Sequence, residues 1–244
     1  MKEKIQITKK WFKSWSNEFD QSLGSMSFHK GLLRLMVESS GVKNNSRILD
    51  IGCGTGLLSI NFLSKRNCSI VGIDNSKDML LILNKKIKKF AITDNLKVQY
   101  MDISKLDFKA NSFDIVTSSM VLHHFDKDKL KLLKKIKKVL KPGGLFILGD
   151  IDMDTRGLHT DTKRLKKIVE VLLSEWVCAL TEVGTEAFKR MYDNGKKHIL
   201  NIGEFCVSFN EWAALCKKAG LKIVKVLPVK ENKHFKVLVA KRVK

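Results

Sequence analysis

The sequence is poor in paired cysteines, in proline and in long apolar runs, and each shortage excludes a class of protein. Five cysteines are scattered along 244 residues and none forms a Cys-x-x-Cys pair, so neither a disulfide framework nor a zinc ribbon is indicated. We expect a reduced, cytoplasmic protein without a metal site. No run of about 18 apolar residues is present to span a membrane, and the N-terminal residues lack the apolar centre of a signal peptide.

Acidic residues are also scarce relative to basic ones. Asp and Glu number 25 against 46 Lys and Arg, which leaves a formal net charge of +21. Such an excess attracts polyanions, either nucleic acid or an anionic membrane surface. Most of the basic residues are lysine, which lacks the bidentate geometry of arginine, and many lie on the polar side of predicted helices. We therefore interpret the charge mainly as surface composition and keep nucleic acid as an alternative partner.

What the sequence does have is a regular alternation of strand-like and helix-like segments. Hydrophobic residues make up 44% of the chain, which is enough for a large core. Short apolar runs, separated by segments with helical periodicity, predict strands at 48–51, 69–73, 97–100, 113–118 and 145–148. Two more runs, 221–228 and 234–240, predict a closing hairpin. The fold class is therefore α/β: a doubly wound, Rossmann-like, mostly parallel sheet with helices on both faces.

We predict a single domain, 1–244, made of four segments. Residues 1–40 are expected to form lid helices, with packing of their aromatic residues on the sheet edge as the alternative. Residues 41–151 are expected to form the binding core. Residues 152–207 are interpreted as a helical insertion that forms a substrate cap. Its expected apolar face consists of Leu165, Ile168, Val169, Leu172, Leu173 and Trp176. In the last segment, 208–244, a helix that begins after Ser208 and ends at Gly220 precedes the hairpin.

A glycine-rich turn, Asp-Ile-Gly-Cys-Gly-Thr-Gly, follows the first predicted strand from Asp50 to Gly56. Glycines permit a sharp turn and let a ligand approach the backbone. No Gly-Lys-Ser/Thr follows, so the turn is not a P-loop, and Leu57 stands where a dinucleotide-binding turn has its third glycine. The spacing favours a nucleoside without phosphates, with an ordinary tight turn as the alternative.

Two acidic residues end the next two predicted strands. Asp74 can accept both hydroxyl groups of a ribose that lies across the sheet, or it can cap the following helix. Asp102 can accept a hydrogen bond from the exocyclic amine of adenine, or it can occupy a turn. Together with the glycine-rich turn, these carboxylates predict a site for ribose and adenine.

Several stretches together resemble class I S-adenosylmethionine-dependent methyltransferases, and in particular the UbiE-like group that methylates small molecules. They are the turn Asp50–Gly56, Asp74, the pair Asp102-Ile103, the segment Phe113–Phe125 and the turn Lys141–Gly144. The resemblance covers residues 40–151 strongly and the tail more loosely. It implies a seven-stranded sheet whose last strand is antiparallel, and S-adenosyl-L-methionine as the cofactor.

The same resemblance assigns the cofactor-binding residues. It implies that the methionine end contacts Asp50, Gly52, Gly54 and Gly56, with Ser118 and Ser119 beside it. The ribose is assigned to Asp74, and the adenine to Asp102 and Ile103. The expected set also includes Cys53, Asn75, Met79 and the lid residue Phe19.

Two histidines, His123 and His124, follow the fourth predicted strand at the mouth of the expected site. A sulfonium methyl group is already activated, so the protein mainly aligns the acceptor and, for some acceptors, removes a proton. An imidazole with a pKa near neutrality suits that transfer. We predict His123 and His124 as candidate bases, with a structural role as the alternative. His159 and His198 in the insertion are weaker candidates.

Three functions are compatible with these patterns. The main prediction is methyl transfer to a small-molecule acceptor, anionic or partly hydrophobic, by a monomer or a homodimer. The alternatives are an RNA (tRNA) methyltransferase, favoured by the net charge of +21, and a non-catalytic S-adenosylmethionine-binding protein. The Ser-Ser-Met-Val sequence that ends the fourth strand differs from the Asn/Asp-Pro-Pro-Tyr type that flanks a flipped base, which disfavours the first alternative.

Overall fold

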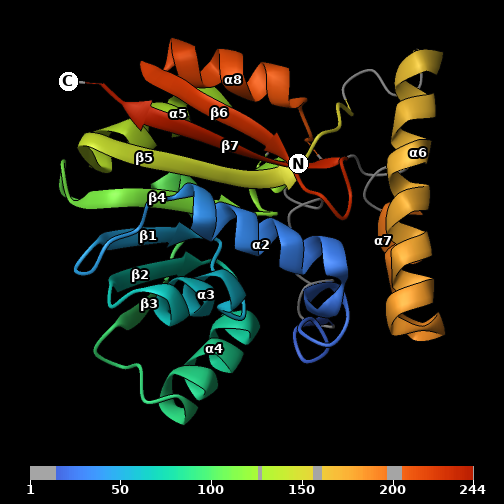
Figure 1. The fold of residues 1–244 in the computed structure, drawn as a ribbon, viewed down its shortest axis with the longest axis horizontal. Helices are drawn as coiled ribbons and strands as arrows, with labels where there is room; N and C mark the ends of the chain where they lie inside the picture. The colour runs from blue at the N-terminus through green and yellow to red at the C-terminus, as the bar shows by residue number, and fades with distance from the viewer. Residues whose placement is uncertain (1–14, 126–127, 156–160, 197–204, 244) are drawn as a thin grey trace.

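A computed structural model describes residues 15–125, 128–155, 161–196 and 205–243 of the chain (Figure 1). One sheet of seven strands forms its centre, in the order β3-β2-β1-β4-β5-β7-β6. The strands are β1 (Arg47–Ile51), β2 (Ser69–Asp74), β3 (Leu96–Tyr100), β4 (Phe113–Ser119), β5 (Leu140–Ile151), β6 (Leu221–Pro228) and β7 (Phe235–Arg242).

Strands β1 to β5 pair in parallel, whereas β7 runs antiparallel to both β5 and β6. The expected seven-stranded sheet with an antiparallel last strand is therefore confirmed. Burial of both faces explains why the central strands are almost continuously apolar. The chain order reverses beside β1, which lies between β2 and β4, and α/β sheets bind ligands at the carboxyl ends of the strands at such a switch point.

Helices cover both faces of the sheet, as expected (Figure 1). On one face, a hydrophobic cluster joins the sheet to α2 (Ser27–Ser39), α3 (Leu57–Lys65) and α4 (Lys77–Lys89). On the other face, a second cluster joins it to α5 (Lys129–Val139) and α8 (Phe209–Lys218). Three 3-10 turns lie in the connections: η1 (Leu23–Ser25), η2 (Ile103–Lys105) and η3 (Leu122–His124).

Capping residues lie where the sequence predicts them, at the starts of α4 and α8 and at the end of α8. The Ser76 hydroxyl accepts a hydrogen bond from the Met79 N–H at the start of α4, and Ser208 does the same for Glu211 at the start of α8. Each serine satisfies a backbone donor that the first helical turn leaves without a partner. After α8, Gly220 adopts a φ of 80°, which is typical of a residue that ends a helix.

Strand β5 is longer than the sequence predicts. It begins at Leu140 directly after α5, so this residue pairs with Phe113 instead of extending the helical face. The expected turn Lys141–Gly144 lies within the strand, next to an irregularity in its pairing with β4. Proline lacks a backbone donor and glycine pairs weakly in a strand, so local propensity predicts a turn here. In the structure, pairing with the neighbouring strands keeps the segment in a distorted strand.

The insertion after β5 consists of helices, as expected, and these lie beyond the carboxyl ends of the parallel strands (Figure 1). They are α6 (Thr162–Cys178), the π-helical turn η4 (Ala179–Val183) and α7 (Thr185–Gly195). The predicted apolar face of α6 is partly wrong. Ile168 and Leu172 are buried, but Leu165 and Val169 are exposed and Leu173 is 50% exposed.

The predicted face is too wide because only a narrow stripe of α6 packs against other elements. This stripe includes Val171 and Glu175 together with Ile168 and Leu172. Periodicity identifies an apolar side of a helix, but the position of the neighbouring elements decides which part of that side is covered. Among the described helices, none is long and apolar enough to cross a membrane.

Candidate active site

The glycine-rich turn connects β1 to α3 and leaves open space beside Gly54. Gly52 and Gly54 adopt φ angles of 70° and 52°, which side chains other than glycine rarely tolerate. A Cβ atom on Gly52 would collide with Val121 of the loop after β4, whereas one on Gly54 would meet no atom within 4 Å. Gly52 is therefore needed for packing, and Gly54 leaves its backbone accessible to a ligand.

Asp74 ties the end of β2 to this turn. Its Oδ2 accepts a hydrogen bond from the Gly54 N–H at 2.8 Å, and its Oδ1 accepts one from the Ser76 N–H at 2.8 Å. Burial raises the pKa of the Asp74 carboxyl, although these backbone hydrogen bonds act in the opposite direction. The N-cap of α4 is Ser76, so Asp74 is not the helix cap that the alternative interpretation required.

Asp50 lies at the end of β1 and is 1% exposed. The Ser59 hydroxyl of α3 donates a hydrogen bond to its Oδ2 at 2.6 Å. Burial raises the pKa of Asp50 to about 7, because removal from water disfavours the charged carboxylate. On the neighbouring strand, the Ser118 hydroxyl donates to the Ile51 carbonyl at 3.0 Å, which joins the ends of β1 and β4.

Asp102 and Ile103 follow the end of β3, close to Asp74. The Met101 N–H donates to the Asp74 carbonyl, and Asp102 begins the 3-10 turn η2 with its Oδ1 accepting from the Ser104 N–H at 2.8 Å. The turn interpretation therefore accounts for one oxygen of this carboxylate. Asp102 thus lies close to Asp74 at the ends of the neighbouring strands β2 and β3.

The other expected cofactor residues occupy different environments. Asn75 is exposed directly after Asp74, while Met79 in the first turn of α4 is 3% exposed. Cys53 is buried, and its sulfur packs so closely on Gly72 that a Cβ there would lie 2.8 Å from it. Burial also raises the pKa of the Cys53 thiol. Its side chain therefore packs on the sheet, and only its backbone follows the glycine-rich turn.

The N-terminal segment reaches the glycine-rich turn through Asp20. The Thr55 hydroxyl donates a hydrogen bond to Asp20 Oδ1 at 2.6 Å, and Lys86 of α4 forms an ion pair with the same carboxylate. Phe19 contacts the rings of Trp15 and His29 edge-to-face. Trp11 and Phe12, which belong to the predicted lid, lie outside the described residues.

His123 pairs with an aspartate that the sequence patterns did not single out. Its Nδ1 lies 2.6 Å from Oδ1 of Asp150 at the end of β5, and both side chains are buried. In the tautomer with the proton on Nδ1, the imidazole donates to Asp150 and the lone pair lies on Nε2. The His124 ring is 4.0 Å from that of His123 between centroids. His159 and His198 lie outside the described residues.

Met120 connects β4 to η3 in an unusual backbone conformation. Its φ is 55°, in the left-handed region that residues other than glycine rarely adopt, and its N–H donates to the Gly149 carbonyl of β5 at 2.8 Å. Such strain concentrates at functional sites, where the surrounding structure holds the residue in place. The segment after β4 is therefore held at the edge where β1, β4 and β5 end.

Two unpartnered polar atoms, of Ser119 and Asp150, lie at the same edge. Within the described ranges, four buried side-chain atoms lack a hydrogen-bond partner: His29 Nδ1, Ser119 Oγ, Asp150 Oδ2 and Asn194 Oδ1. Ser119 and Asp150 end the neighbouring strands β4 and β5, and His29 lies in the first turn of α2. Buried polar atoms are usually paired, so bound ligand atoms are a natural source of these missing partners.

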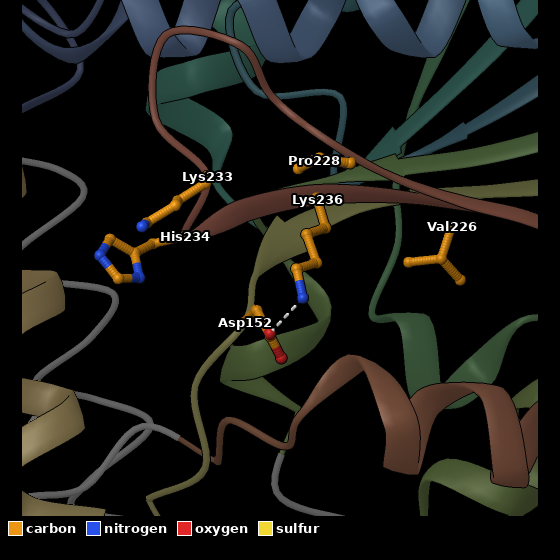
Figure 2. A pocket seen from close by; sticks show the side chains of 6 residues that line it. All are labelled: Asp152, Val226, Pro228, Lys233, His234 and Lys236. Carbon is orange, nitrogen blue, oxygen red and sulfur yellow. Dashed lines mark hydrogen bonds and ion pairs between the residues drawn. The ribbon is translucent and has the colours of Figure 1, made fainter.

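A solvent-accessible pocket of about 390 Å³ lies at the other end of this edge, beside the β6–β7 hairpin (Figure 2). Its lining consists of Asp152, Val226, Pro228, Lys233, His234 and Lys236. Figure 2 shows Lys236 reaching Asp152, and their ion pair measures 2.7 Å. Burial and the neighbouring Lys233 lower the pKa of His234. None of these residues belongs to the glycine-rich turn, so this pocket is separate from the expected cofactor site.

The comparisons with known proteins agree with this geometry. Residues 48–144 match a methyltransferase domain family. The chain is 30% identical over 152 residues to a 27-O-demethylrifamycin SV methyltransferase of Amycolatopsis mediterranei, covering 59% of this chain and 56% of that protein. It is 33% identical over 150 residues to the ubiquinone/menaquinone biosynthesis C-methyltransferase UbiE of Proteus mirabilis, covering 60% and 59%. The chain thus spans little more than half the length of these relatives.

A solved structure extends the likeness of fold to nearly the whole chain. It contains a methyltransferase in complex with the Haloferax volcanii Trm112 methyltransferase activator, with a TM-score of 0.68 and 16% identity, and the match covers 96% of this chain and 98% of that one. The strand order, the glycine-rich turn and the matched domain lead to one conclusion. The chain is similar to the class I S-adenosylmethionine-dependent methyltransferases over residues 48–144, with UbiE-like enzymes among its relatives.

Proposed function

We propose that the protein transfers a methyl group from S-adenosyl-L-methionine to a small-molecule acceptor. The observation that carries the proposal is the pairing of the glycine-rich turn with Asp74 at the point where the strand order reverses. This arrangement offers a carboxylate for ribose hydroxyls and an open backbone at Gly54. It lacks the Gly-Lys-Ser/Thr sequence of a phosphate-binding P-loop, which suits a nucleoside without phosphates.

The residues present fit this cofactor. Gly54 and the unpartnered Ser119 hydroxyl would face its methionine part, beside the buried Asp50. Asp74 would accept from the ribose hydroxyls, and Asp102 would accept from the adenine amine. When bound, the cofactor supplies a methyl group on a positively charged sulfur, which is activated for in-line displacement. The expected roles of Ser118 and Cys53 are then structural, through the Ile51 carbonyl and Gly72.

His123 is the favoured base for acceptors that must lose a proton. Asp150 holds the ring by Nδ1, which keeps Nε2 in the form that accepts a proton. In the proposed reaction, His123 would take the proton of the acceptor as the acceptor atom receives the methyl group that the cofactor supplies. The adjacent Asp150 carboxylate would stabilise the imidazolium that results. His124 contacts His123 and is a second candidate.

The acceptor is proposed to bind under the cap formed by α6 and α7, at the edge where the strands end (Figure 1). The relatives named above act in rifamycin and in ubiquinone and menaquinone chemistry, which supports a partly hydrophobic acceptor that bears oxygen atoms. An RNA acceptor is supported only by the net charge of +21. All five cysteines are free thiols, which supports a cytoplasmic location. We propose that the protein acts there as a monomer or a homodimer.

The test is transfer of isotopically labelled methyl groups from S-adenosylmethionine. Demethylmenaquinone in its reduced form is the first acceptor, and a metabolite extract and total RNA are the others. We expect label in a small molecule, with little dependence on salt, because phosphate contacts would make RNA binding strongly salt-dependent. Asp74→Ala should abolish transfer at low cofactor concentration, while Asp94→Ala, which removes an exposed carboxylate, should not. Label found only in RNA, or nowhere, would contradict the proposal.

A further inference from the structure

His29, in the first turn of α2, is a buried histidine that the proposed mechanism does not use. The residue is 3% exposed, and its Nδ1 has no hydrogen-bond partner among the described residues. Burial lowers the pKa of His29 to about 4, although nearby Asp20 raises it. The ring is therefore neutral at physiological pH, with one nitrogen that donates and one that accepts.

The surroundings of His29 place it between the lid and the cap. Phe19 packs edge-to-face on its ring at 6.1 Å, and the next residue, Asp20, binds Thr55 of the glycine-rich turn. Just before His29, the backbone N–H and the hydroxyl of Ser27 both donate to Glu182 of η4, at 2.6 and 2.7 Å. His29 thus lies where the N-terminal segment, the glycine-rich turn and the insertion meet.

The packing of α2 on the sheet defines which end of the helix reaches the site. A Cβ on Gly149 near the end of β5 would collide with Met36 and would lie 3.1 Å from Leu32. Leu32 therefore packs over the last residues of β5, and His29 lies one turn nearer the N-terminal end of α2. That end of the helix points toward the carboxyl edge of the sheet (Figure 1), where Ser119 and Asp150 present two of the other unpartnered atoms.

A purely structural role does not account for this histidine. The ring packs on Phe19, and Leu32 and Leu33 are also buried on α2. An apolar residue would therefore fit much of the same environment despite the nearby Asp20. A buried polar atom without a partner destabilises the folded protein, and native proteins contain few such atoms. A ligand that supplies the missing hydrogen bond would explain both the burial and the polarity.

We propose that His29 binds the methyl acceptor, with Nδ1 forming a hydrogen bond to an oxygen atom of that molecule. The ligand class is a hydroxylated or carbonyl-bearing small molecule. This inference rests on the proposed methyl transfer and adds a specificity-determining group to its acceptor site. His123 cannot supply the same contact through its own Nδ1, because Asp150 occupies that nitrogen. The two histidines therefore have separate tasks: His29 orients the acceptor, and His123 removes its proton.

The test uses two substitutions at His29 and a matched control. His29→Leu retains the apolar packing and removes both nitrogens. His29→Asn restores a polar atom near the position of Nδ1. His234→Leu changes a histidine of the separate β6–β7 pocket. For each variant, we would measure the unfolding temperature without ligand, the S-adenosylmethionine affinity by calorimetry, and kcat and KM with reduced demethylmenaquinone and labelled cofactor.

We expect His29→Leu to unfold at the same or a higher temperature than wild type, because it removes an unsatisfied buried group. Cofactor affinity should stay within about twofold, whereas kcat/KM for the acceptor should fall by about tenfold or more, as for the loss of one hydrogen bond to a substrate. His29→Asn should recover part of this loss. His234→Leu should match wild type in all three measurements.

Other results would overturn the inference in distinguishable ways. Unchanged kcat/KM in His29→Leu would show that the ring only packs. A tenfold loss of cofactor affinity would assign Nδ1 to the cofactor instead of the acceptor. A lower unfolding temperature for both His29 variants, with cofactor affinity and turnover falling in parallel, would indicate a structural role. If wild type does not methylate demethylmenaquinone, a metabolite extract replaces it, and absence of transfer there would refute the proposed function as well.

Discussion

Binding of S-adenosylmethionine should release a proton from Asp50. This carboxyl is 1% exposed, and burial raises its pKa to about 7. At pH 6.5, a group with this pKa is protonated in about 0.8 of the molecules. The proposed methionine site brings a cofactor with a net positive charge next to it, and a nearby positive charge lowers the pKa of a carboxyl. About 0.8 proton should therefore leave Asp50 for each cofactor bound.

Isothermal titration calorimetry measures this quantity directly. The observed binding enthalpy is plotted against the ionisation enthalpy of several buffers at pH 6.5. Protons released on binding are taken up by the buffer, so the slope is negative and its magnitude is the number of protons released. At this pH, the amino group of the cofactor is already charged, since α-amino groups have a pKa of about 8. Asp50→Asn is the control, because it retains the shape and the acceptor for Ser59 but cannot ionise. Its slope should be less negative than that of wild type by about 0.8.

The reasoning would be refuted by a slope near zero for wild type, or by equal slopes for wild type and Asp50→Asn. The first result would mean that Asp50 is already ionised in the free protein. The second would mean that the proton comes from another group. A reversed slope, with proton uptake on binding, would place the cofactor carboxylate against Asp50 and reverse the proposed orientation of the methionine part.

The same carboxyl should make the cofactor-free protein less stable as pH rises from about 4 to about 7. Because the raised pKa keeps the proton on Asp50 in the folded state, the free energy of unfolding should be lower by up to about 4 kcal/mol above pH 7 than below pH 4. Chemical denaturation should show a weaker dependence of stability on pH for Asp50→Asn. Asp74→Ala should weaken cofactor binding by about 1–3 kcal/mol, the cost of losing a charged acceptor, and calorimetry should show no such loss for Asp94→Ala. Asp150→Asn should lower kcat by at least about tenfold while cofactor affinity stays unchanged, because the pair with His123 is disrupted; normal turnover would remove His123 as the base. Trp212→Ala should lower the free energy of unfolding by about 3–5 kcal/mol, because this side chain of α8 is 1% exposed, and a smaller loss in urea denaturation would show that the core around α8 is loosely packed.

Much of the fold follows from neighbouring residues in the chain. The α/β alternation, the cap at Ser76 and the end of α8 at Gly220 depend on side chains acting on backbone groups within a few positions. The structure differs where tertiary pairing dominates. Leu140 continues the apolar periodicity of the helix but lies in β5, because it pairs with Phe113. No local pattern predicts that partner.

The candidate site shows the same division. The glycine-rich turn and Asp74 could be assigned from their positions after successive strands, because the carboxyl ends of parallel strands meet at one edge. Asp150 and Asp20 could not be assigned partners in advance, since they contact residues 27 and 35 positions away. His29 gave no signal in the sequence beyond its presence in an apolar helix, and only its burial without a partner for Nδ1 identifies it.

The net charge of +21 and the composition of the insertion do not determine which residues of this chain are buried or paired. Amino-acid order by itself determined the strands, the glycine-rich turn and the carboxylates that follow it, because turn chemistry and periodicity are local properties. Only the tertiary structure decided that Leu165, Val169 and Leu173 of α6 are exposed, and that Asp150 holds His123. It also decided that the His29 side chain is buried, with no partner for Nδ1 among the described residues. Burial and pairing depend on which elements pack against one another, and that arrangement is a property of the whole fold.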